Sequence, residues 1–394
     1  YEQLSGDAIV VWNDNTQAAG NKLRYAVWDG TGWSAPQSIT AYTGTEPQNL
    51  RLAFDPGSDS MVLVVDDVNA DDYALVWDGD NWGNAITLDT TGTAESDQSA
   101  IAVSFEAQSG HALVTYGING STDVYYRIWD GSSWSGEGSI ANPGGSSGDV
   151  RWTTLGAEAG TDRIALGVLT RDNNIWFSIW DGSTWGWRQT ATTSSGSQVC
   201  PNLAVAFESD SGEALAVYGE TSDVLRYLSW DEIGAWSSEM DVADLGAEPN
   251  SMFLDADPLS DQVMLSVQDA DSSLHFILWD GSTWGAGNEL EPFTSEIKNQ
   301  RFIFLWEQIS DGWTIGGRVF EDVDFAGIAT DWDGGSNDVP IANADVELYD
   351  SSDDCISTVV TDPSGNFLFS DLGDGVFKVR VRSASIGIPG TSPA

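Results

Sequence analysis

The chain has 394 residues, 61 of them acidic and 15 basic, which gives a formal net charge of −46. This charge would repel a polyanion, so nucleic acid is not expected as a partner, and divalent cations or a salty exterior are favoured. The length exceeds what one hydrophobic core usually supports, so at least two domains are expected. No apolar run approaches the roughly 20 residues of a membrane span. We expect Tyr1 to be a processed or excised start, since no signal peptide precedes it.

A short motif, Trp-Asp-Gly-x-x-Trp, returns six times at intervals of 49 to 52 residues, and its fifth copy carries one extra residue. A fixed period of this size indicates a repeat architecture. Asp-Gly favours a tight turn, and each Trp supplies an apolar face of roughly 150–250 Å². The motif is therefore predicted to be structural. Its residues are Trp28, Asp29, Gly30 and Trp33; Trp77, Asp78, Gly79 and Trp82; Trp129, Asp130, Gly131 and Trp134; Trp180, Asp181, Gly182 and Trp185; Trp230, Asp231 and Trp236; and Trp279, Asp280, Gly281 and Trp284.

Aligned on this motif, the repeats show four short strands each, rich in Val, Ile, Leu and aromatic residues. Several strands are nearly continuous apolar runs, as in a sheet covered on both faces, and the blades of a propeller are covered in this way. The first repeat lacks its first strand, because the chain begins with Tyr1–Ala8 at the junction that elsewhere precedes a second strand. The stretch Arg301–Ser310 is a first strand without a second. Residues 1–312 are therefore predicted to form a six-bladed β-propeller, closed by Arg301–Trp306 and without exposed edges.

A different module follows in residues 313–394. Its predicted strands form a small antiparallel β-sandwich, so the whole chain is expected to be all-β. These strands are Ile315–Phe320, Ala344–Tyr349, Ser357–Thr361, Asn366–Phe369 and Val376–Arg382. The last segment, Ser383–Ala394, is rich in Ser, Gly and Pro and is predicted to be a linker or tail.

Residues 315–382 resemble the B-type domains of bacterial surface adhesins of the serine-aspartate-repeat and collagen-adhesin type. The segments that carry the resemblance are Gly317–Asp324, Val346–Asp350, Thr361–Phe369 and Leu372–Val379. The resemblance implies a secreted stalk or spacer, and members of this family often bind calcium in the loop after the first strand. The candidate ligands are Asp322, Asp324, Asp331, Asp333 and Asp338, with Ala326 at the next ligand position after Asp324. Carboxylates are suitable ligands for calcium; the alternative is a solvated acidic loop.

The propeller resembles fungal and bacterial six-bladed lectins whose repeats also contain Trp-Asp-Gly-x-x-Trp. Those lectins bind sugar between blades through an Arg, a Glu and an aromatic residue. Arg24, Arg127 and Arg226 precede the motif at differing offsets, whereas the other three blades have Tyr73, Phe177 and His275 nearby. No glutamate recurs beside the arginines, so the lectin sugar site is not carried over and the three arginines alone are candidates for a glycan site.

No catalytic site is predicted. The two histidines, His111 and His275, have no recurring Ser or Cys partner that would indicate a nucleophile and its base. The pairs Asp66-Asp67 and Asp71-Asp72 have the carboxylates that glycoside hydrolysis needs, but such pairs are expected without function in so acidic a chain. Cys200 and Cys355 are expected to be unpaired buried thiols, with a disulfide between them as the alternative.

The sequence thus predicts a secreted or cell-surface structural or adhesive protein, in which a calcium-stabilised sandwich presents the propeller. The propeller would serve adhesion or self-association, and the latter would build an extracellular layer or filament. A glycan-binding propeller is the alternative, which binding to a glycan array that depends on the blade arginines would favour. A glycosidase is a remote alternative.

Overall fold

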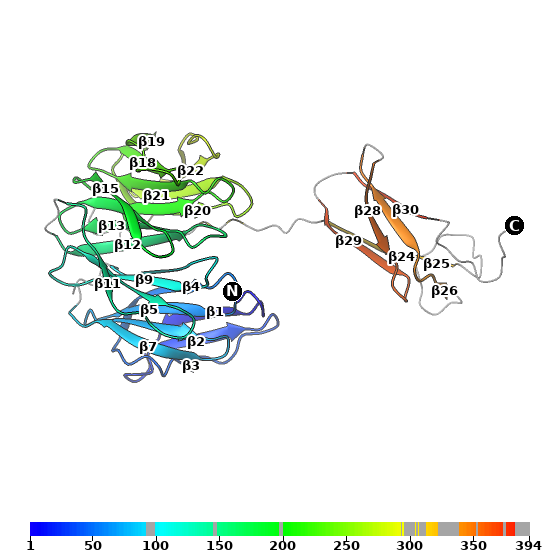
Figure 1. Ribbon diagram of the computed structural model, residues 1–394, viewed down its shortest axis with the longest axis horizontal. Helices are drawn as coiled ribbons and strands as arrows, with labels where there is room; N and C mark the ends of the chain where they lie inside the picture. Colours follow the sequence, from blue (N-terminus) through cyan, green and yellow to red (C-terminus); the bar gives the residue numbers. More distant parts are fainter. Residues whose placement is uncertain are drawn as a thin grey trace. The chain divides into compact units, whose positions relative to one another are not determined.

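The computed structural model describes residues 1–91, 99–144, 148–196, 200–292, 294, 304, 306, 313–321, 339–351, 354–372 and 376–382. In these residues all regular structure is β-strand. The chain divides into two compact units, Tyr1–Trp306 and Glu307–Ala394, which are drawn in Figure 1. Among the described segments there is no helix of the length and apolarity needed to cross a membrane.

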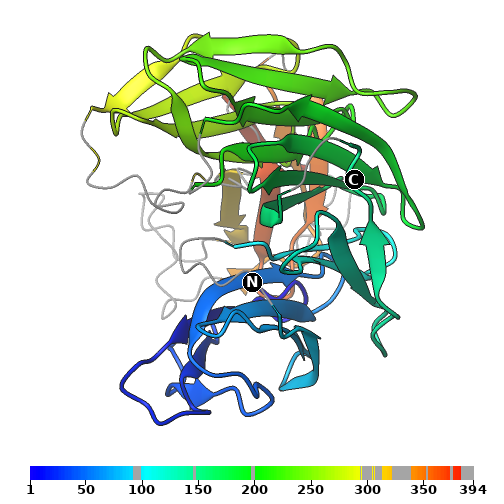
Figure 2. The ribbon, with the colours of Figure 1, turned by 90° about the vertical axis from the view of Figure 1, so that its left-hand side faces the viewer.

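The first unit consists of six antiparallel sheets that follow one another in chain order. The first sheet has three strands and each of the others has four, with sequence neighbours paired side by side. Figure 2 shows these sheets arranged around an arc, from blue to yellow. This is the six-bladed β-propeller that the repeat predicted. Its strands are β1 (Ala8–Asn13), β2 (Leu23–Trp28) and β3 (Gln37–Ser38); β4 (Pro47–Phe54), β5 (Met61–Asp67), β6 (Asp72–Trp77) and β7 (Trp82–Asp89); β8 (Ala102–Phe105), β9 (Ala112–Gly117), β10 (Val124–Trp129) and β11 (Gly138–Ile140); β12 (Val150–Ala157), β13 (Ile164–Thr170), β14 (Ile175–Trp180) and β15 (Trp185–Thr192); β16 (Leu203–Phe207), β17 (Ala214–Gly219), β18 (Val224–Trp230) and β19 (Met240–Asp244); and β20 (Pro249–Ala256), β21 (Val263–Asp269), β22 (Leu274–Trp279) and β23 (Asn288–Glu291).

The hydrophobic cores lie between neighbouring blades. Between the fourth and fifth blades, for example, Trp152, Phe177, Leu203, Tyr218 and Trp236 belong to one buried cluster. Equivalent clusters lie between the first and second blades, the second and third, the third and fourth, and the fifth and sixth. Because each middle blade is covered on both faces, strands such as β9, β13 and β17 are buried along their whole length. This explains their continuous apolar sequences.

Two neighbouring blades form one structural repeat, which the 50-residue period did not reveal. A glutamate before the second strand of each odd blade accepts a hydrogen bond from the first motif tryptophan of the next blade. These pairs are Glu2 with Trp77, Glu106 with Trp180, and Glu208 with Trp279. A tyrosine of each odd blade also lies against both tryptophans of the next motif, with ring centroids 5.6 to 6.2 Å apart. These tyrosines are Tyr25, Tyr126 and Tyr227. The propeller is therefore built from three tandem pairs of blades.

The outer strands depart from the expected repeat. They begin at the second motif tryptophan only in the second and fourth blades, where Asn84 and Trp187 adopt positive φ angles of 45° and 48°. The ladders of these two blades shift register within the outer strand pair. In the sixth blade Trp284 makes only an isolated bridge to Trp279, and the outer strand β23 begins at Asn288.

The segment expected to close the propeller, Arg301–Trp306, is described only at Phe304 and Trp306. Both residues contact the sixth blade. The indole N–H of Trp306 donates to the carbonyl of Asp255 at 2.9 Å, and the ring of Phe304 lies 6.1 Å from that of Phe276. Asp255 belongs to the inner strand β20, beside which the first strand of the next blade would lie. Pairing of this segment with β1 falls outside the described residues and stays a prediction.

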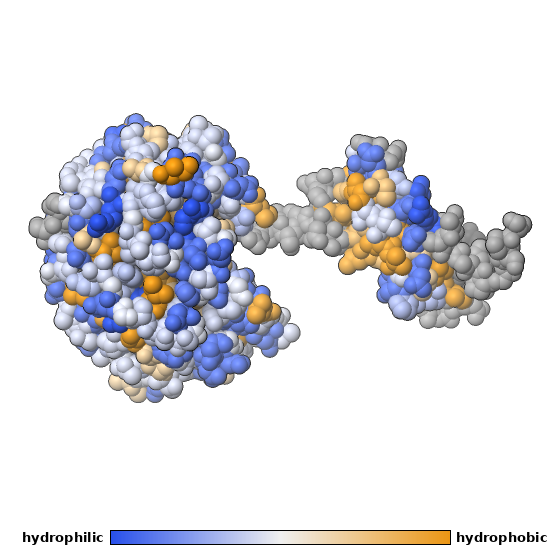
Figure 3. Space-filling view, viewed as in Figure 1, coloured by the Kyte–Doolittle hydropathy of each residue, from blue (hydrophilic) through white to orange (hydrophobic). Residues whose placement is uncertain are grey.

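The second unit contains the predicted small antiparallel β-sandwich. Its sheets have the orders β24-β29, β25-β26 and β28-β27-β30. Val346, Leu348, Phe369 and Leu372 form its buried core. Figure 3 shows that apolar residues also lie on the surface of this unit. Its strands are β24 (Trp313–Arg318), β25 (Phe320–Glu321), β26 (Val339–Pro340), β27 (Asp345–Tyr349), β28 (Cys355–Val360), β29 (Asn366–Leu372) and β30 (Lys378–Val381).

Candidate binding sites between blades

The motif tryptophans serve mainly as scaffold. The first tryptophan is buried in the second to sixth blades, whereas Trp33 of the first blade is 54% exposed. In five copies the two rings of the motif lie 5.3 to 5.7 Å apart at angles of 53° to 56°. This tilted arrangement is favourable for aromatic pairs. The tryptophans therefore provide packing surface, as the sequence predicted.

The motif aspartate caps the turn between the two tryptophans. In the third blade one oxygen of Asp130 accepts hydrogen bonds from the backbone N–H groups of Ser132 and Ser133, at 2.9 and 2.7 Å. In the first blade, the hydroxyl of Thr31 and backbone N–H groups donate to Asp29 and lower its pKa to about 2. The motif glycines adopt φ angles of 85° to 98°, a region that glycine enters without steric cost. The hydrogen bonds of the aspartate and the positive φ of the glycine therefore explain why Asp-Gly recurs in the turn.

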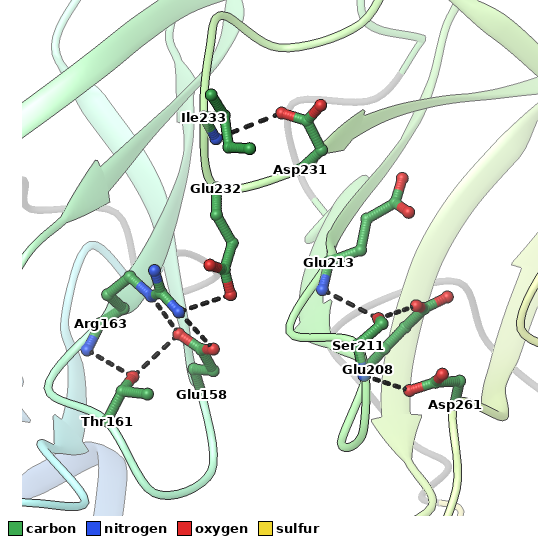
Figure 4. A network of polar contacts seen from close by, with 10 residues as sticks. All are labelled: Glu158, Thr161, Arg163, Glu208, Ser211, Glu213, Asp231, Glu232, Ile233 and Asp261. Carbon is green, nitrogen blue, oxygen red and sulfur yellow. Dashed lines mark hydrogen bonds and ion pairs between the residues drawn. The ribbon is translucent and has the colours of Figure 1, made fainter.

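The fifth copy has Glu232 at the glycine position, with a φ of 70°. Its carboxylate accepts a hydrogen bond of 2.6 Å from Arg163 of the fourth blade, and Arg163 also binds the buried Glu158 (Figure 4). The guanidinium of Arg163 lies 5.9 Å from the centre of the Trp230 ring. The backbone strain at Glu232 is thus accompanied by an ion network that joins the fourth and fifth blades.

A group of three side chains lies at the edge of the third blade. The hydroxyl of Tyr116 donates to Glu137 at 2.6 Å, and a guanidinium nitrogen of Arg127 lies 4.0 Å from the same carboxylate oxygen. Arg127 also donates to the carbonyl of Ser135 at 2.8 Å, but its Nε has no hydrogen-bond partner within the described residues. The ring of Tyr125 is stacked 6.1 Å from that of Tyr116. Arg127 and Glu137 are partly exposed above a buried tyrosine.

The same group recurs in the fifth blade. The hydroxyl of Tyr218 donates to Glu239 at 2.7 Å, and Nε of Arg226 lies 3.7 Å from that carboxylate and 3.8 Å from Glu220. This Nε also makes no hydrogen bond in the described structure, and another nitrogen of Arg226 binds Asp241. Tyr116 packs in the core between the second and third blades, and Tyr218 in the core between the fourth and fifth. Both groups therefore lie at the same kind of blade interface.

The first blade has an incomplete counterpart. Trp12 takes the place of the tyrosine and Pro36 that of the glutamate, three residues after the second motif tryptophan. Arg24 donates to the carbonyl of Pro36 at 2.6 Å. The interpretation that no glutamate accompanies the arginines is thus wrong for Arg127 and Arg226 and holds for Arg24. The differing sequence offsets concealed the shared geometry.

The aromatic positions of the even blades do not form sites. Tyr73 packs against Tyr42, with ring centroids 5.3 Å apart, and Phe177 is fully buried. His275 is buried in the sixth blade, where its Nε2 lies 2.8 Å from a carboxylate oxygen of Asp269. These three residues belong to the packing between blades.

The electrostatic surroundings keep both site tyrosines protonated. Burial, together with the hydrogen bond to the glutamate, raises the pKa of Tyr116 and of Tyr218 far above the ordinary value. Each hydroxyl is thereby a fixed donor to its glutamate. One oxygen of each glutamate is occupied in this way, so the other oxygen of this partly exposed carboxylate can accept a hydrogen bond from a ligand.

The aspartate pairs of the second blade are separated by its fold. Asp67 is buried and accepts hydrogen bonds from the backbone N–H groups of Thr45 and Asn69, at 2.7 and 2.8 Å. Asp66 and Asp72 are instead direct partners across β5 and β6. Burial raises the pKa of Asp66 to about 6, and burial and the charge of Asp66 raise the pKa of Asp72 well above its ordinary value. This arrangement is a buried polar row within the sheet.

Other predicted features are distributed as follows. The five candidate calcium ligands lie outside the described residues, and the described part of the chain contains no cluster of acidic, His or Cys side chains suited to a metal ion.

His111 lies 3.4 Å from Glu106. Cys200 and Cys355 are thiols and not a disulfide. Cys200 is buried, but Cys355 is exposed because it begins the edge strand β28, so the expectation of two buried thiols is wrong for Cys355.

Comparison with known proteins is informative for both units. Residues 313–393 match the family model of the SdrD B-like domain. The chain is similar to a lectin from Burkholderia pseudomallei, with 11% identity, a TM-score of 0.51, and coverage of 72% of this chain and 84% of that chain. A mutant Aleuria aurantia lectin in complex with Fucα1-6GlcNAc has 17% identity, a TM-score of 0.42, and coverage of 73% and 94%. No curated protein matches the chain. At such identities the similarity shows the propeller fold alone.

Proposed function

We propose that the protein is a non-enzymatic, glycan-binding adhesive protein of the cell surface or the secreted fraction. Its binding sites are the groups around Arg127 and Arg226. The observation that carries the proposal is the recurrence of arginine, glutamate and tyrosine at two equivalent blade interfaces, 102 residues apart from Glu137 to Glu239, with the same tyrosine–glutamate hydrogen bond in both. Two copies of a partly exposed polar group are difficult to explain by packing alone.

The chemistry of each group suits a neutral sugar. A guanidinium supplies several donors in a fixed fork, and a carboxylate supplies acceptors, so together they match neighbouring sugar hydroxyls. The distances of 4.0 and 3.7 Å between the charged groups show that neither arginine is saturated by its glutamate. The buried tyrosine holds the glutamate in place, which reduces the ordering that binding would otherwise require.

The second unit supports a location outside the cell. Its match to the SdrD B-like domain is to a module of the adhesin type, and we propose that it acts as a spacer for the propeller. The aspartates from Asp322 to Asp338 remain the proposed calcium ligands of this spacer, because hard oxygen donors suit that ion. Calorimetric titration of the full chain with calcium tests this point, and absence of heat would contradict it.

The glycan proposal is tested with the purified full chain on a glycan array. We expect binding to a defined set of neutral glycans, and loss of that binding in the double variant Arg127→Ala/Arg226→Ala. Arg24→Ala is the matched control, because the first blade has Pro36 in place of the glutamate, and it should bind as the parent does. Equal array signals from the double variant and the parent would overturn the proposed sites.

Self-association is a second candidate, favoured by the surface of the sandwich unit. Ile356, Val360, Leu368 and Val376 are between 49% and 70% exposed. Exposed apolar side chains on so small a unit are typical of contact surfaces. Sedimentation of the chain over a salt and calcium series tests this candidate, since screening should allow chains of charge −46 to associate. A monomer throughout would reject it.

A further inference from the structure

The inner strands of five blades line one cavity of about 210 Å³. Its walls come from β4, β8, β12, β16 and β20 and combine polar groups with apolar side chains such as Val103, Leu155 and Val205. Three polar side chains, Arg51, Thr153 and Thr154, line it. The cavity lies away from the arginine–glutamate groups described above, and none of their residues lines it.

Arg51 is a cation without a counter-charge. Within the described residues its single hydrogen bond runs from Nη1 to the carbonyl of Leu50, at 3.1 Å, and it makes no ion pair. Burial lowers the pKa of this guanidinium, and no neighbouring carboxylate offsets the effect. Arginines elsewhere, such as Arg163 and Arg226, contact carboxylates. Arg51 is partly buried, and a partly desolvated charge that makes no ion pair with the described residues favours an anionic partner at the cavity.

The inner strands differ from the rest of the chain in charge. The chain has 61 acidic residues, yet the five inner strands that line the cavity contain only one, Asp255. The backbone N–H of Trp306 lies 3.3 Å from the carboxylate of Asp255. The lining of the cavity contains one guanidinium group, that of Arg51, and no carboxylate. In a strongly negative protein this local charge favours an anion there.

Thr153 provides an independent indication. It is buried, it lines the cavity, and its hydroxyl has no hydrogen-bond partner among the described residues. Buried polar groups are nearly always satisfied, so an orphaned hydroxyl at a cavity indicates a missing ligand or water. Together with Arg51 it gives the cavity a cationic donor and an unsatisfied hydroxyl.

We propose that this cavity binds a small organic carboxylate. The Arg51 guanidinium pairs with the carboxylate, the Thr153 hydroxyl donates to one of its oxygens, and the apolar wall takes an aromatic or branched aliphatic body. Size is consistent with this ligand class, since an apolar cavity of about 150 Å³ accepts benzene. The present cavity of about 210 Å³ has room for a ring with a carboxylate attached.

The test uses benzoate and benzyl alcohol, which have similar size and differ in charge. Calorimetric titration of the full chain should show that benzoate binds at least tenfold more tightly than benzyl alcohol. Arg51→Gln should abolish this preference, and Thr153→Val should weaken benzoate binding several-fold. Arg188→Gln is the control, because Arg188 is exposed and donates to the carbonyl of Ala141 at 2.8 Å. Failure of the native chain to bind benzoate, or an undiminished preference in Arg51→Gln, would overturn the proposal.

A readout on the native chain makes the test independent of variant stability. The chain has four methionines, and Met252 lines the cavity. With methyl-labelled methionine, benzoate should shift the Met252 signal and leave that of Met61, which is buried between the first and second blades, in place. Shifts elsewhere without a shift of Met252 would place benzoate outside the cavity and reject the proposal.

Discussion

At the scale of single residues, the tryptophans of the motif have unequal surroundings. Trp180 is 2% exposed, donates to the buried Glu106 and packs against Tyr126, whereas Trp33 is 54% exposed. The free energy that each ring contributes follows from the apolar area it buries and from its hydrogen bond. The sequence motif places a tryptophan at both positions and does not show how much of each ring is buried.

The first prediction compares these two tryptophans. Trp180→Ala should lower the free energy of unfolding by about 3–5 kcal/mol, the usual range for truncating a buried large aromatic. Trp33→Ala should cost less than about 1 kcal/mol, because its ring is largely solvated. Urea unfolding of the two variants measures the difference. Equal losses would show that burial does not control the contribution of the motif.

The second prediction concerns Arg163, which bridges Glu158 and Glu232. Arg163→Ala should destabilise the chain by about 1–3 kcal/mol, because it leaves the carboxylate of Glu158 buried without its main donor. Glu232→Gly should be close to neutral, since it removes one partly exposed ion pair and also relieves a positive φ. Urea unfolding measures both variants. A larger loss of stability in Glu232→Gly than in Arg163→Ala would contradict the account of this network.

At the scale of elements, the sequence predicted nearly every strand of the propeller, because apolar runs and turn residues are local signals. The outer strands were less predictable. Their first residues depend on positive φ angles at Asn84 and Trp187, and the residue types at these two positions do not indicate such angles. Glu137 and Glu239 were missed for a related reason. Arg127 precedes its tryptophan by two residues and Arg226 by four, so only the folded strands show that both guanidinium groups reach an equivalent carboxylate.

The third prediction concerns the polar row of the second blade. The pKa of Asp66 is about 6 in the folded chain and close to 3.9 when unfolded, so the native state binds more protons in this interval. This contribution to stability is fully present below about pH 4 and declines as the pH rises through 6. The raised pKa of its partner Asp72 contributes a decline in the same direction.

The measurement is the free energy of unfolding between pH 4 and 8. Asp66→Asn/Asp72→Asn should flatten the decline, whereas Asp210→Asn, at an exposed position, should leave the slope unchanged. A double variant with the slope of the parent would show that other groups set the pH dependence.

At the scale of the whole molecule, three tandem blade pairs account for the arrangement of the sites. Glutamate–tryptophan bonds hold each odd blade to the next even one. The arginine–glutamate groups lie at the alternate interfaces, between an even blade and the following odd one. A search at the 50-residue period averages over these two kinds of interface, which is why the sequence analysis did not separate them.

The fourth prediction concerns closure of the propeller. Deleting Arg301–Trp306 removes the contacts of Phe304 and Trp306 with the sixth blade and, on the sequence prediction, the first strand of the first blade. The melting temperature and solubility should both fall, because an apolar strand edge becomes exposed. Deleting Ser383–Ala394 is the control and should change neither. Unchanged melting of the first variant would show that the segment is only a linker.

The number of oligosaccharide molecules bound per chain tests the central claim most directly. Native mass spectrometry with the oligosaccharide that gives the strongest array signal should show two bound molecules on the parent chain. Arg127→Ala and Arg226→Ala should each retain one, and the double variant none. A parent chain that binds no oligosaccharide, or a double variant that binds as many molecules as the parent, would contradict the assignment of these two blade interfaces as glycan sites.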